Sequence, residues 1–470
     1  MIPNIESQGT PKVKFIIMIV ASAALGGFLF GFDTAVINGA VLAMKNYFGI
    51  GEWATGLAVS LALLGSAVGA FAAGPLADKI GRVRSMMICS GLFAASAIGS
   101  GLPFSIYDFI FWRVLGGVAV GAASVLAPAY IAEVAPASMR GRLGSMQQLA
   151  IVTGIFIALL LNFVIADAAG GSAENPWWLG LPAWKWMFLT ELPPAILYGI
   201  AVAFIPESPR YLMAVGRTQD AKLVFTRLFG DEKVAQDKVL EIQQTLNAES
   251  KPHMRDLRGS ALGLLPIVWI GIALAAFQQL VGINVIFYYS STLWQAAGFG
   301  EGSALKITVI TGAVNILTTL IAIAFIDKIG RKPLLIVGSI GMAAALLTMA
   351  LCFSFATKGA DGAPVLSGSM GIVTLLAANI YVFFFGASWG PIVWVLLGEM
   401  FPNRIRAAGL ALGACIGWVS NFAVSTTFPP MLAGIGLGAS YMIYGGMSVI
   451  SFFFVWKYVK ETKGKELEAM

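Results

Sequence analysis

Apolar runs long enough to cross a bilayer alternate with short polar connections along almost the whole chain. A helix needs about 20 apolar residues to cross the hydrocarbon core of a membrane, and twelve segments meet that requirement. The pattern therefore predicts an all-α membrane protein with twelve transmembrane helices. The expected segments are 14–41, 54–77, 84–102, 107–133, 143–166, 186–205, 261–296, 303–326, 334–357, 370–399, 404–430 and 438–459.

Residues 206–260 form the one long polar interruption of this pattern. They contain two helix-forming stretches, "DAKLVFTRLF" and "DEKVAQDKVLEIQQTL", so we expect short cytosolic or interfacial helices here and no separate domain. The polar N-terminal segment "MIPNIESQGTPKVK" shows no signal-peptide cleavage pattern. The first apolar run is therefore expected to remain as a membrane span.

Composition supports the membrane assignment and shows how the chain is oriented. Of 470 residues, 58% are hydrophobic and 11% are charged, whereas soluble domains carry about 25% charged residues. The net charge of +6 does not indicate a nucleic-acid partner, because the basic residues lie in the connections between spans. Twenty-five Lys and Arg residues fall on the side that holds both termini, and four fall on the other side. Both termini are therefore expected in the cytoplasm.

The residue types that usually build metal or redox sites are rare here. The three cysteines, Cys89, Cys352 and Cys415, lie inside apolar segments without metal-binding or redox spacing. The only histidine, His253, lies in a polar connection. We expect buried apolar cysteines, no metal site and no cofactor.

The two halves of the chain repeat each other. Six spans, a long connection and six related spans predict two six-helix bundles about a pseudo-two-fold axis, with a cavity between them at the membrane midplane. The expected division is an N-terminal bundle (1–205), a cytoplasmic linker (206–260) and a C-terminal bundle with a short tail (261–470). The echoed stretches are "GPLADKIGRVR" (74–84) with "AFIDKIGRKPL" (324–334), "AEVAPASMRGRLG" (132–144) with "GEMFPNRIRAAG" (398–409), and "PESPRYL" (206–212) with "KETKGKEL" (460–467).

Asp33 stands in the middle of the apolar run "GGFLFGFDTAVINGA". A charge at the bilayer centre costs about 2.5–3.5 kcal/mol on insertion scales, so it should have a partner or a function. Arg113 lies in the fourth span, and both residues fall roughly 10 Å below the outer surface at 1.5 Å per helical residue. We expect these two side chains to pair.

The pair could be a fixed structural element, or Asp33 could bind and release a proton. Burial favours the neutral form of a carboxyl group and a neighbouring arginine favours the charged form, so a change in either contact changes its proton affinity. Glu191, in "FLTELPPA", is a second candidate for proton coupling. The alternative for Glu191 is an interfacial glutamate near solvent.

Neutral polar and aromatic side chains recur inside the spans. Amides both donate and accept hydrogen bonds and aromatic rings offer apolar faces, so these side chains need polar partners, neighbouring helices or a cavity. Gln278 and Asn284 would not share a face of a regular helix, so we expect local unwinding at Gly282. The remaining polar and aromatic positions are Gln148, Gln279, Tyr288, Tyr289, Trp394, Trp418, Asn421 and a single face of Thr311, Asn315, Thr318 and Thr319.

Charged residues of both signs recur at the inner ends of the spans. They could pair between the bundles and close the inner mouth, as a latch that favours the outward-open state and breaks on release of substrate. The alternative is that the basic residues fix orientation and the acids neutralise them. The residues are Asp78, Arg82, Glu133, Arg140, Asp327, Arg331, Glu399 and Arg406.

The repeated D-[KR]-x-G-R loop, "PESPR", "QQLVGINVIFYYS" and "ETKGK" together resemble the sugar-porter branch of the major facilitator superfamily. The resemblance covers nearly the whole chain. It is greatest to bacterial glucose/proton symporters, and the bacterial xylose symporter and the facilitative glucose transporters are broader relatives. It implies a multi-pass protein of the bacterial cell (inner) membrane, with Asp33 as protonation site and Arg113 as its partner. Many relatives have an amide where this chain has Gly417, which leaves one hydrogen bond to sugar in doubt. The implied sugar-binding positions are Gln148, Gln278, Gln279, Asn284, Asn315 and Trp394, with Phe30, Phe385 and Trp418 lining the pocket.

The leading hypothesis is therefore inward symport of a hexose, D-glucose in the first place, with a proton. A facilitator in which Asp33 is locked is the near alternative, and a sugar sensor is disfavoured by the short tail. A membrane enzyme is remote, since no nucleotide-binding loop, metal cluster or catalytic triad is visible. The expected partners are a monosaccharide, a proton and the lipid bilayer, with no nucleic acid, and the protein is expected to be monomeric.

Overall fold

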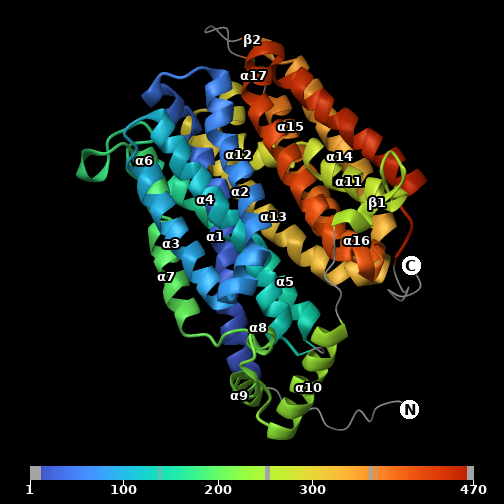
Figure 1. Ribbon diagram of the computed structural model, residues 1–470. Coiled ribbons are helices and arrows are strands. Elements are labelled where there is room, and N and C mark those ends of the chain that lie inside the picture. Colours follow the sequence, from blue (N-terminus) through green and yellow to red (C-terminus); the bar gives the residue numbers. More distant parts are fainter. Residues whose placement is uncertain (1–11, 137–138, 249–253, 359–363, 367, 463–470) are drawn as a thin grey trace.

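The computed structural model describes residues 12–136, 139–248, 254–358, 364–366 and 368–462. Two helical bundles lie side by side, the first drawn in blue to green and the second in yellow to red (Figure 1). The first bundle consists of α1 (Val13–Phe48), α2 (Glu52–Ile80), α3 (Arg82–Gly101), α4 (Ile106–Val134), α5 (Arg140–Ala168), α6 (Ala183–Leu189) and α7 (Leu192–Ala203).

The second bundle repeats this plan with two more interrupted spans. In the first bundle α6 and α7 form one crossing that is broken before Glu191. In the second bundle the chain breaks at Gly282, whose φ of 85° ends one helix and starts the next, and at a π-helical turn, η4 (Phe385–Trp389). The helices are α11 (Pro266–Leu280), α12 (Ile283–Ala296), α13 (Glu301–Ile329), α14 (Arg331–Ser354), α15 (Gly368–Phe384), α16 (Gly390–Met400) and α17 (Asn403–Tyr458).

The last helix accounts for two crossings. Within the described residues, eleven helices are long and apolar enough to cross a membrane, and the apolar part of α17 alone has 51 residues. At 1.5 Å per residue it is roughly 76 Å long, more than twice the thickness of the hydrocarbon core. The backbone turns at Gly436, with φ of 77°, shortly after Pro429 and Pro430. The twelve predicted crossings in two pseudo-symmetric bundles are therefore confirmed, with the last two joined at this bend.

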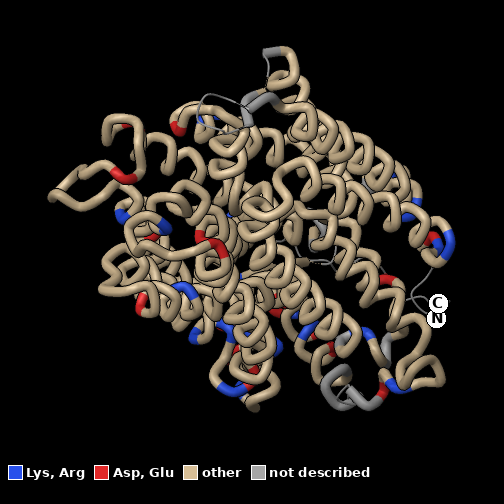
Figure 2. The backbone as a smooth tube through the Cα atoms, turned by 90° about the horizontal axis from the view of Figure 1, so that it is seen from above, with Lys and Arg blue, Asp and Glu red and all other residues tan. Residues whose placement is uncertain are grey.

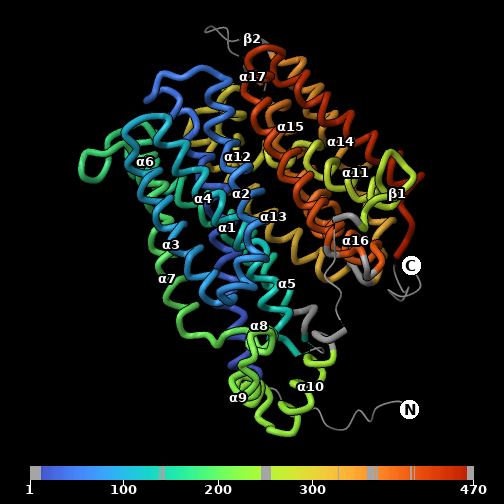
Figure 3. The backbone as a smooth tube through the Cα atoms, viewed as in Figure 1, coloured from blue at the N-terminus to red at the C-terminus, as the bar shows by residue number. Residues whose placement is uncertain are grey.

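The segment between the bundles forms short helices on one end of the first bundle. Their side chains Val224, Phe225 and Leu228 are buried there, in a core that also contains Ile16 and Ile19 of α1. The backbone N–H of Lys12 also donates to Leu228, at 2.9 Å. We call this end of the molecule the inner end and the opposite one the outer end (Figure 3). The linker elements are α8 (Pro209–Ala214), α9 (Thr218–Phe229), α10 (Glu232–Ala248), η3 (Met254–Leu257) and β1 (Arg258–Ala261).

Few charged residues interrupt the helical core. Seen from above, most of the tube carries neither sign of charge (Figure 2). At the outer end of the second bundle, β2 (Thr357–Lys358) and β3 (Pro364–Val365) pair antiparallel between α14 and α15. The polar groups that matter for function are therefore a small set inside the bundles.

Candidate functional site

The buried acid and base of the first bundle form an ion pair. Nη1 of Arg113, in α4, lies 2.7 Å from Oδ1 of Asp33, in α1, and Nη2 donates to the backbone oxygen of Asp33 at 3.2 Å. The two residues are 2% and 1% exposed. The pair expected from matching depth is present. Each charge thus has a partner of opposite sign inside the bundle. Burying either charge without its partner would cost far more free energy.

Glu191 joins this pair. It lies at the break between α6 and α7, is 1% exposed and lies close enough to Asp33 and Arg113 to interact electrostatically with both. The interpretation of Glu191 as an interfacial residue near solvent is therefore wrong, because the break turns its side chain into the bundle. Asp33, Glu191 and Arg113 therefore form a buried group of two acids and one base.

The two sides of this group differ. On one side the Arg113 guanidinium lies over the ring of Phe188, 5.6 Å from its centroid, and Phe188 packs against Phe109 at 5.4 Å. On the other side, Asp33 and Arg113 border a cavity of about 10 Å³ that Tyr288 of the second bundle also lines. A space of that size admits roughly one water molecule. The acid–base group therefore reaches the boundary between the bundles at Tyr288.

Three side-chain amides form a chain across the break in the second bundle. Asn284 donates to Gln279 at 2.6 Å, and Gln279 donates to Gln278 at 3.4 Å. Gln278 in turn donates to the backbone oxygens of Trp389 and Gly390, each at 3.0 Å. The predicted unwinding at Gly282 is confirmed, and it brings residues together that a regular helix would separate.

Aromatic and polar side chains from both bundles lie near the middle of the molecule. The rings of Phe30, in α1, and Trp418, in α17, are 5.9 Å apart, so they meet across the boundary between the bundles. Tyr288, in α12, accepts a hydrogen bond from Asn421 at 3.2 Å. This arrangement of rings and neutral polar groups is suited to a ligand that has hydroxyl groups and an apolar face.

The remaining predicted sugar-binding positions are linked less directly to the three amides. Asn315 is buried on α13. The face of α13 that carries Asn315 and Thr318 packs closely against the π-helical turn, since a Cβ atom added at Gly386 would lie only 2.3 Å from Oγ1 of Thr318. Gln148 and Phe385 are half-buried, and Trp394 is 43% exposed. Among the described residues, the structure shows no hydrogen bond or ring contact that joins Gln148, Phe385 or Trp394 to the three amides.

At the inner end of the first bundle, charged residues pair with each other. Arg82 lies 2.9 Å from Asp78 and 3.1 Å from Glu133. Glu207 of the "PESPR" motif accepts hydrogen bonds from the backbone N–H groups of Arg82 and Val83 at the start of α3. A carboxylate at the positive end of a helix is favourable.

The second bundle repeats this network. Arg331 lies 2.7 Å from Glu399, and Glu461 of the "ETKGK" motif accepts from the backbone N–H groups of Arg331 and Lys332 at the start of α14. The hydroxyl of Thr462 donates to Glu399, as that of Ser208 donates to Glu133. The sequence repeat is thus a repeat of capping and ion pairing.

The proposed latch between the bundles is not tested by these pairs, which lie within single bundles. Arg406 donates through Nε to the backbone oxygen of Phe401 at 3.2 Å. The side chains of Arg140 and Asp327 lie outside the described part of the structure. The latch stays a prediction for a state in which the inner ends meet.

Sequence analysis missed the polar contacts at the outer end of the boundary. Asn38, in α1, donates to the backbone oxygen of Phe287 at 2.9 Å and accepts from the N–H of Ser291 at 3.2 Å, both in α12. The hydroxyls of Ser60, in α2, and Thr426, in α17, are 2.6 Å apart. A lone amide in the run "TAVINGA" was the available signal, since a buried amide in a span needs a partner.

Two bundles of six membrane crossings that face each other across a polar and aromatic site define a membrane transporter of the major facilitator fold. The model of the family "Sugar (and other) transporter" matches residues 19–470. The chain belongs to this family.

Curated relatives and solved structures agree with this assignment. The chain is 60% identical to a glucose transport protein of Synechocystis sp., over 99% of this chain and 98% of the relative. It is 38% identical to the D-xylose-proton symporter of Escherichia coli K12, over 97% of this chain and 95% of the relative. The partially occluded inward-open structure of the E. coli xylose transporter XylE superposes with a TM-score of 0.82, at 36% identity, over 96% of this chain and all of that one. The structure of XylE bound to 6-bromo-6-deoxy-D-glucose superposes with a TM-score of 0.76, at 37% identity, over 97% of this chain and 98% of that one.

Proposed function

We propose that this protein carries a hexose, D-glucose in the first place, into the cell together with a proton. The buried group of Asp33, Arg113 and Glu191 beside the bundle boundary carries this proposal. A facilitator needs no titratable acid in that position, whereas a symporter needs one that changes its proton affinity with conformation. The relatives that are named as glucose transporters and proton symporters support the same function.

Asp33 accepts the transported proton and Arg113 responds to it. Protonation of Asp33 removes the negative charge that holds the guanidinium at 2.7 Å. The attraction that holds Arg113 at Asp33 is then weaker. The cavity that Arg113 and Tyr288 both line lies directly beside this pair. Because Tyr288 belongs to the second bundle, a change at the acid alters a contact between the bundles. Glu191 keeps a second carboxyl group in reach, so the proton has two possible positions inside the site.

The sugar is bound between the bundles by the amides and rings. In this structure Asn284 donates to Gln279, Gln279 to Gln278, and Gln278 to the backbone oxygen of Trp389, and sugar hydroxyls can serve these amides as donors and acceptors. Phe30 and Trp418 supply apolar faces from opposite bundles. The other positions proposed to contribute are Gln148, Tyr288, Asn315, Phe385 and Trp394.

Transport proceeds by rocking of the two bundles about this site. The moving bodies are residues 1–205 and 261–470, with 206–260 as the cytoplasmic linker and the charged inner ends as the latch. Contacts at the outer end and the TM-score of 0.82 with inward-open XylE structures support an inward-facing state. The protein acts as a monomer in the bacterial inner membrane, with both termini in the cytoplasm.

Uptake of labelled glucose into proteoliposomes tests the proposal. With acid outside, the wild-type protein should accumulate glucose above the external concentration, and dissipating the pH gradient should return it to equilibrium. Asp33→Asn should lose accumulation but keep exchange of internal for external glucose, since exchange needs no net proton transfer. Equal uptake with and without the gradient would show a facilitator and overturn the proposal. A panel of unlabelled glucose, galactose, xylose and fructose as competitors would identify the preferred sugar.

A further inference from the structure

The connection between α5 and α6 carries a short, closed turn that we call the tryptophan hairpin, residues 175–182 ("NPWWLGLP"). Pro176 and Pro182 pair as an antiparallel bridge, and the N–H of Trp177 donates to the oxygen of Leu181 at 2.8 Å. A single 3₁₀ turn, η2 (Trp178–Gly180), forms the tip. The hairpin projects sideways beyond α6, away from the bundle axis (Figure 1).

The hairpin holds two large apolar side chains of its tip outward. Trp178 is 62% and Leu179 is 76% exposed. Leu179 has a φ of 55°, a conformation that side chains other than glycine adopt only when the surroundings impose it. The oxygen of Trp178 accepts from Nε1 of Trp186 at 2.8 Å, and their rings lie 4.8 Å apart. The contacts with Trp186 therefore hold the tip in place, so that Trp178 and Leu179 are exposed as part of an ordered fold.

The chemistry of the tip suits the boundary between lipid and water. No charged residue occurs from Asn175 to Trp184, and the hairpin lies in the connection between the outer ends of two membrane crossings, α5 and α6. The neighbouring crossing ends carry exposed aromatic residues as well, among them Trp53, Phe104 and Tyr107. The lipid side of α7, on the same crossing as α6, continues this surface with Leu197. Tryptophan and tyrosine are enriched at the level of the lipid headgroups, where an apolar ring with a polar edge is stable.

The base of the hairpin is tied to both bundles. The N–H of Ala173 donates to Oε1 of Glu301, at the start of α13, at 2.7 Å. Asn46, at the end of α1, donates to Glu174 at 2.6 Å. A lipid contact at the tip is thus linked to the outer ends of both halves.

We propose that the tip of the tryptophan hairpin, residues 177–180, inserts into the headgroup layer of the outer leaflet and anchors the outer end of the first bundle there. The partner is the lipid surface itself. This role does not depend on the sugar or on proton coupling.

Nitroxide labels in proteoliposomes test the depth of the tip. Leu179→Cys, and separately Trp178→Cys, are labelled in a chain whose Cys352 and Cys415 are replaced by serine; Cys89 is buried and stays. Collision with oxygen, which partitions into lipid, is compared with collision with a water-soluble nickel chelate. Leu197→Cys provides the lipid control and Gln236→Cys, exposed on α10, provides the water control.

The oxygen-to-nickel ratio at both tip positions should exceed that at Gln236 at least threefold and remain below that at Leu197. A ratio equal to that at Gln236 would place the tip in water and overturn the proposal. Low collision with both reagents, or spin–spin broadening between labels, would show that a second copy of the chain covers the tip, which would also overturn it. Unchanged glucose exchange by the labelled variants shows that they are folded.

Discussion

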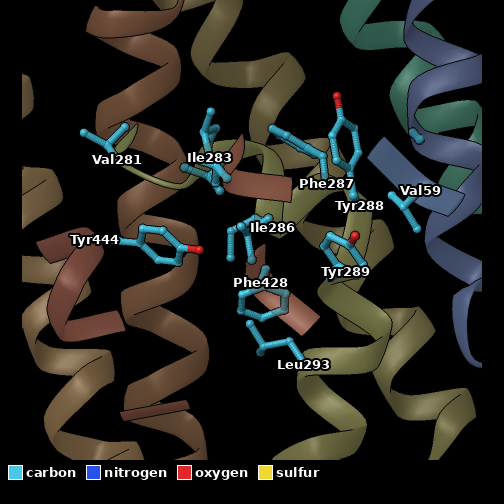
Figure 4. Packing of buried hydrophobic residues seen from close by; sticks show 14 of the residues in the cluster. Val59, Val281, Ile283, Ile286, Phe287, Tyr288, Tyr289, Leu293, Phe428 and Tyr444 are labelled. Atoms are coloured by element: carbon cyan, nitrogen blue, oxygen red, sulfur yellow. The ribbon is translucent and has the colours of Figure 1, made fainter. Parts of the chain in front are cut away.

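The outer and inner halves of α1 lie in different surroundings. From Phe32 to Met44 the buried side chains belong to a core that includes Tyr289 and Phe428 of the second bundle. Figure 4 shows this region, where Val59 of α2 and Tyr288 of α12 line the same cavity. From Ile16 to Leu29 the buried side chains belong to a core whose buried members all come from residues 16–239. One helix is thus packed against both bundles at its outer end and against its own bundle and the linker at its inner end.

The polar groups differ in the same way. At the outer end, neutral amides and hydroxyls of one bundle bond to the other. At the inner end, Arg82 pairs with Glu133 and Arg331 with Glu399, each within its bundle. A neutral hydrogen bond contributes about 1 kcal/mol, so the outer contacts are weak enough to open. Charges already paired within a bundle leave no buried ion unpaired when the inner ends separate.

A covalent bond across the outer half should produce the largest effect. Ser60→Cys with Thr426→Cys, in the background without Cys352 and Cys415, places two sulfurs where the hydroxyls are 2.6 Å apart. Oxidation should form a disulfide and stop glucose uptake almost completely, because the outer end can no longer open; a reductant should restore it. Each single cysteine variant provides the control. Full uptake by the crosslinked protein would show that the outer contacts are not a gate.

Removal of the cross-bundle amide should have an intermediate effect. Asn38→Ala deletes the side-chain hydrogen bonds to α12, of which the two shorter contribute together about 2 kcal/mol, and should shift the equilibrium toward outward-facing by about 30-fold. The measurement is labelling of Leu432→Cys, which lines a pocket between the bundles at the outer end, by a membrane-impermeant maleimide. Asn46→Ala is the matched control, because its bond to Glu174 stays within the first half. Equal labelling of both variants would contradict the assignment of Asn38.

Neutralising one inner pair should have the smallest effect. Glu399→Gln weakens the contacts with Arg331 and Thr462 and should lower stability by about 1 kcal/mol, since the pair is partly solvated. Its pseudo-symmetric control, Glu133→Gln, should behave alike. If these acids also form the latch between bundles, both variants should label less at Leu432→Cys, because the outward-facing state loses support. An unchanged labelling pattern would count against the latch.

Much of this architecture could be predicted from sequence because the bilayer imposes strict rules. Span length, the Lys and Arg bias and the depth of Asp33 and Arg113 follow from hydrophobicity and helical rise alone. The break at Gly282 was predictable because its polar neighbours could not share one helical face. The burial of Glu191 was harder to predict: the two prolines of "FLTELPPA" indicate that a helix is interrupted and restarts there, but not that the side chain of Glu191 points into the bundle.

The contacts between the bundles could be predicted least. Asn38 and Ser60 meet groups about 250 and 366 residues away, and their registers depend on how two bundles pack in one conformational state. The charged inner residues were recognised correctly as a set, but sequence cannot show whether their partners are in the same bundle or the other. That choice changes as the bundles move.

The central claim, that the proton held by Asp33 travels with the sugar, is tested most directly by proton movement itself. Proteoliposomes with a trapped pH-sensitive dye, and no initial pH gradient, are given an inward glucose gradient. The wild-type protein should acidify the lumen as glucose enters, and Asp33→Asn should not, although it still exchanges glucose. Glucose entry without acidification in the wild type, or equal acidification by Asp33→Asn, would contradict the account.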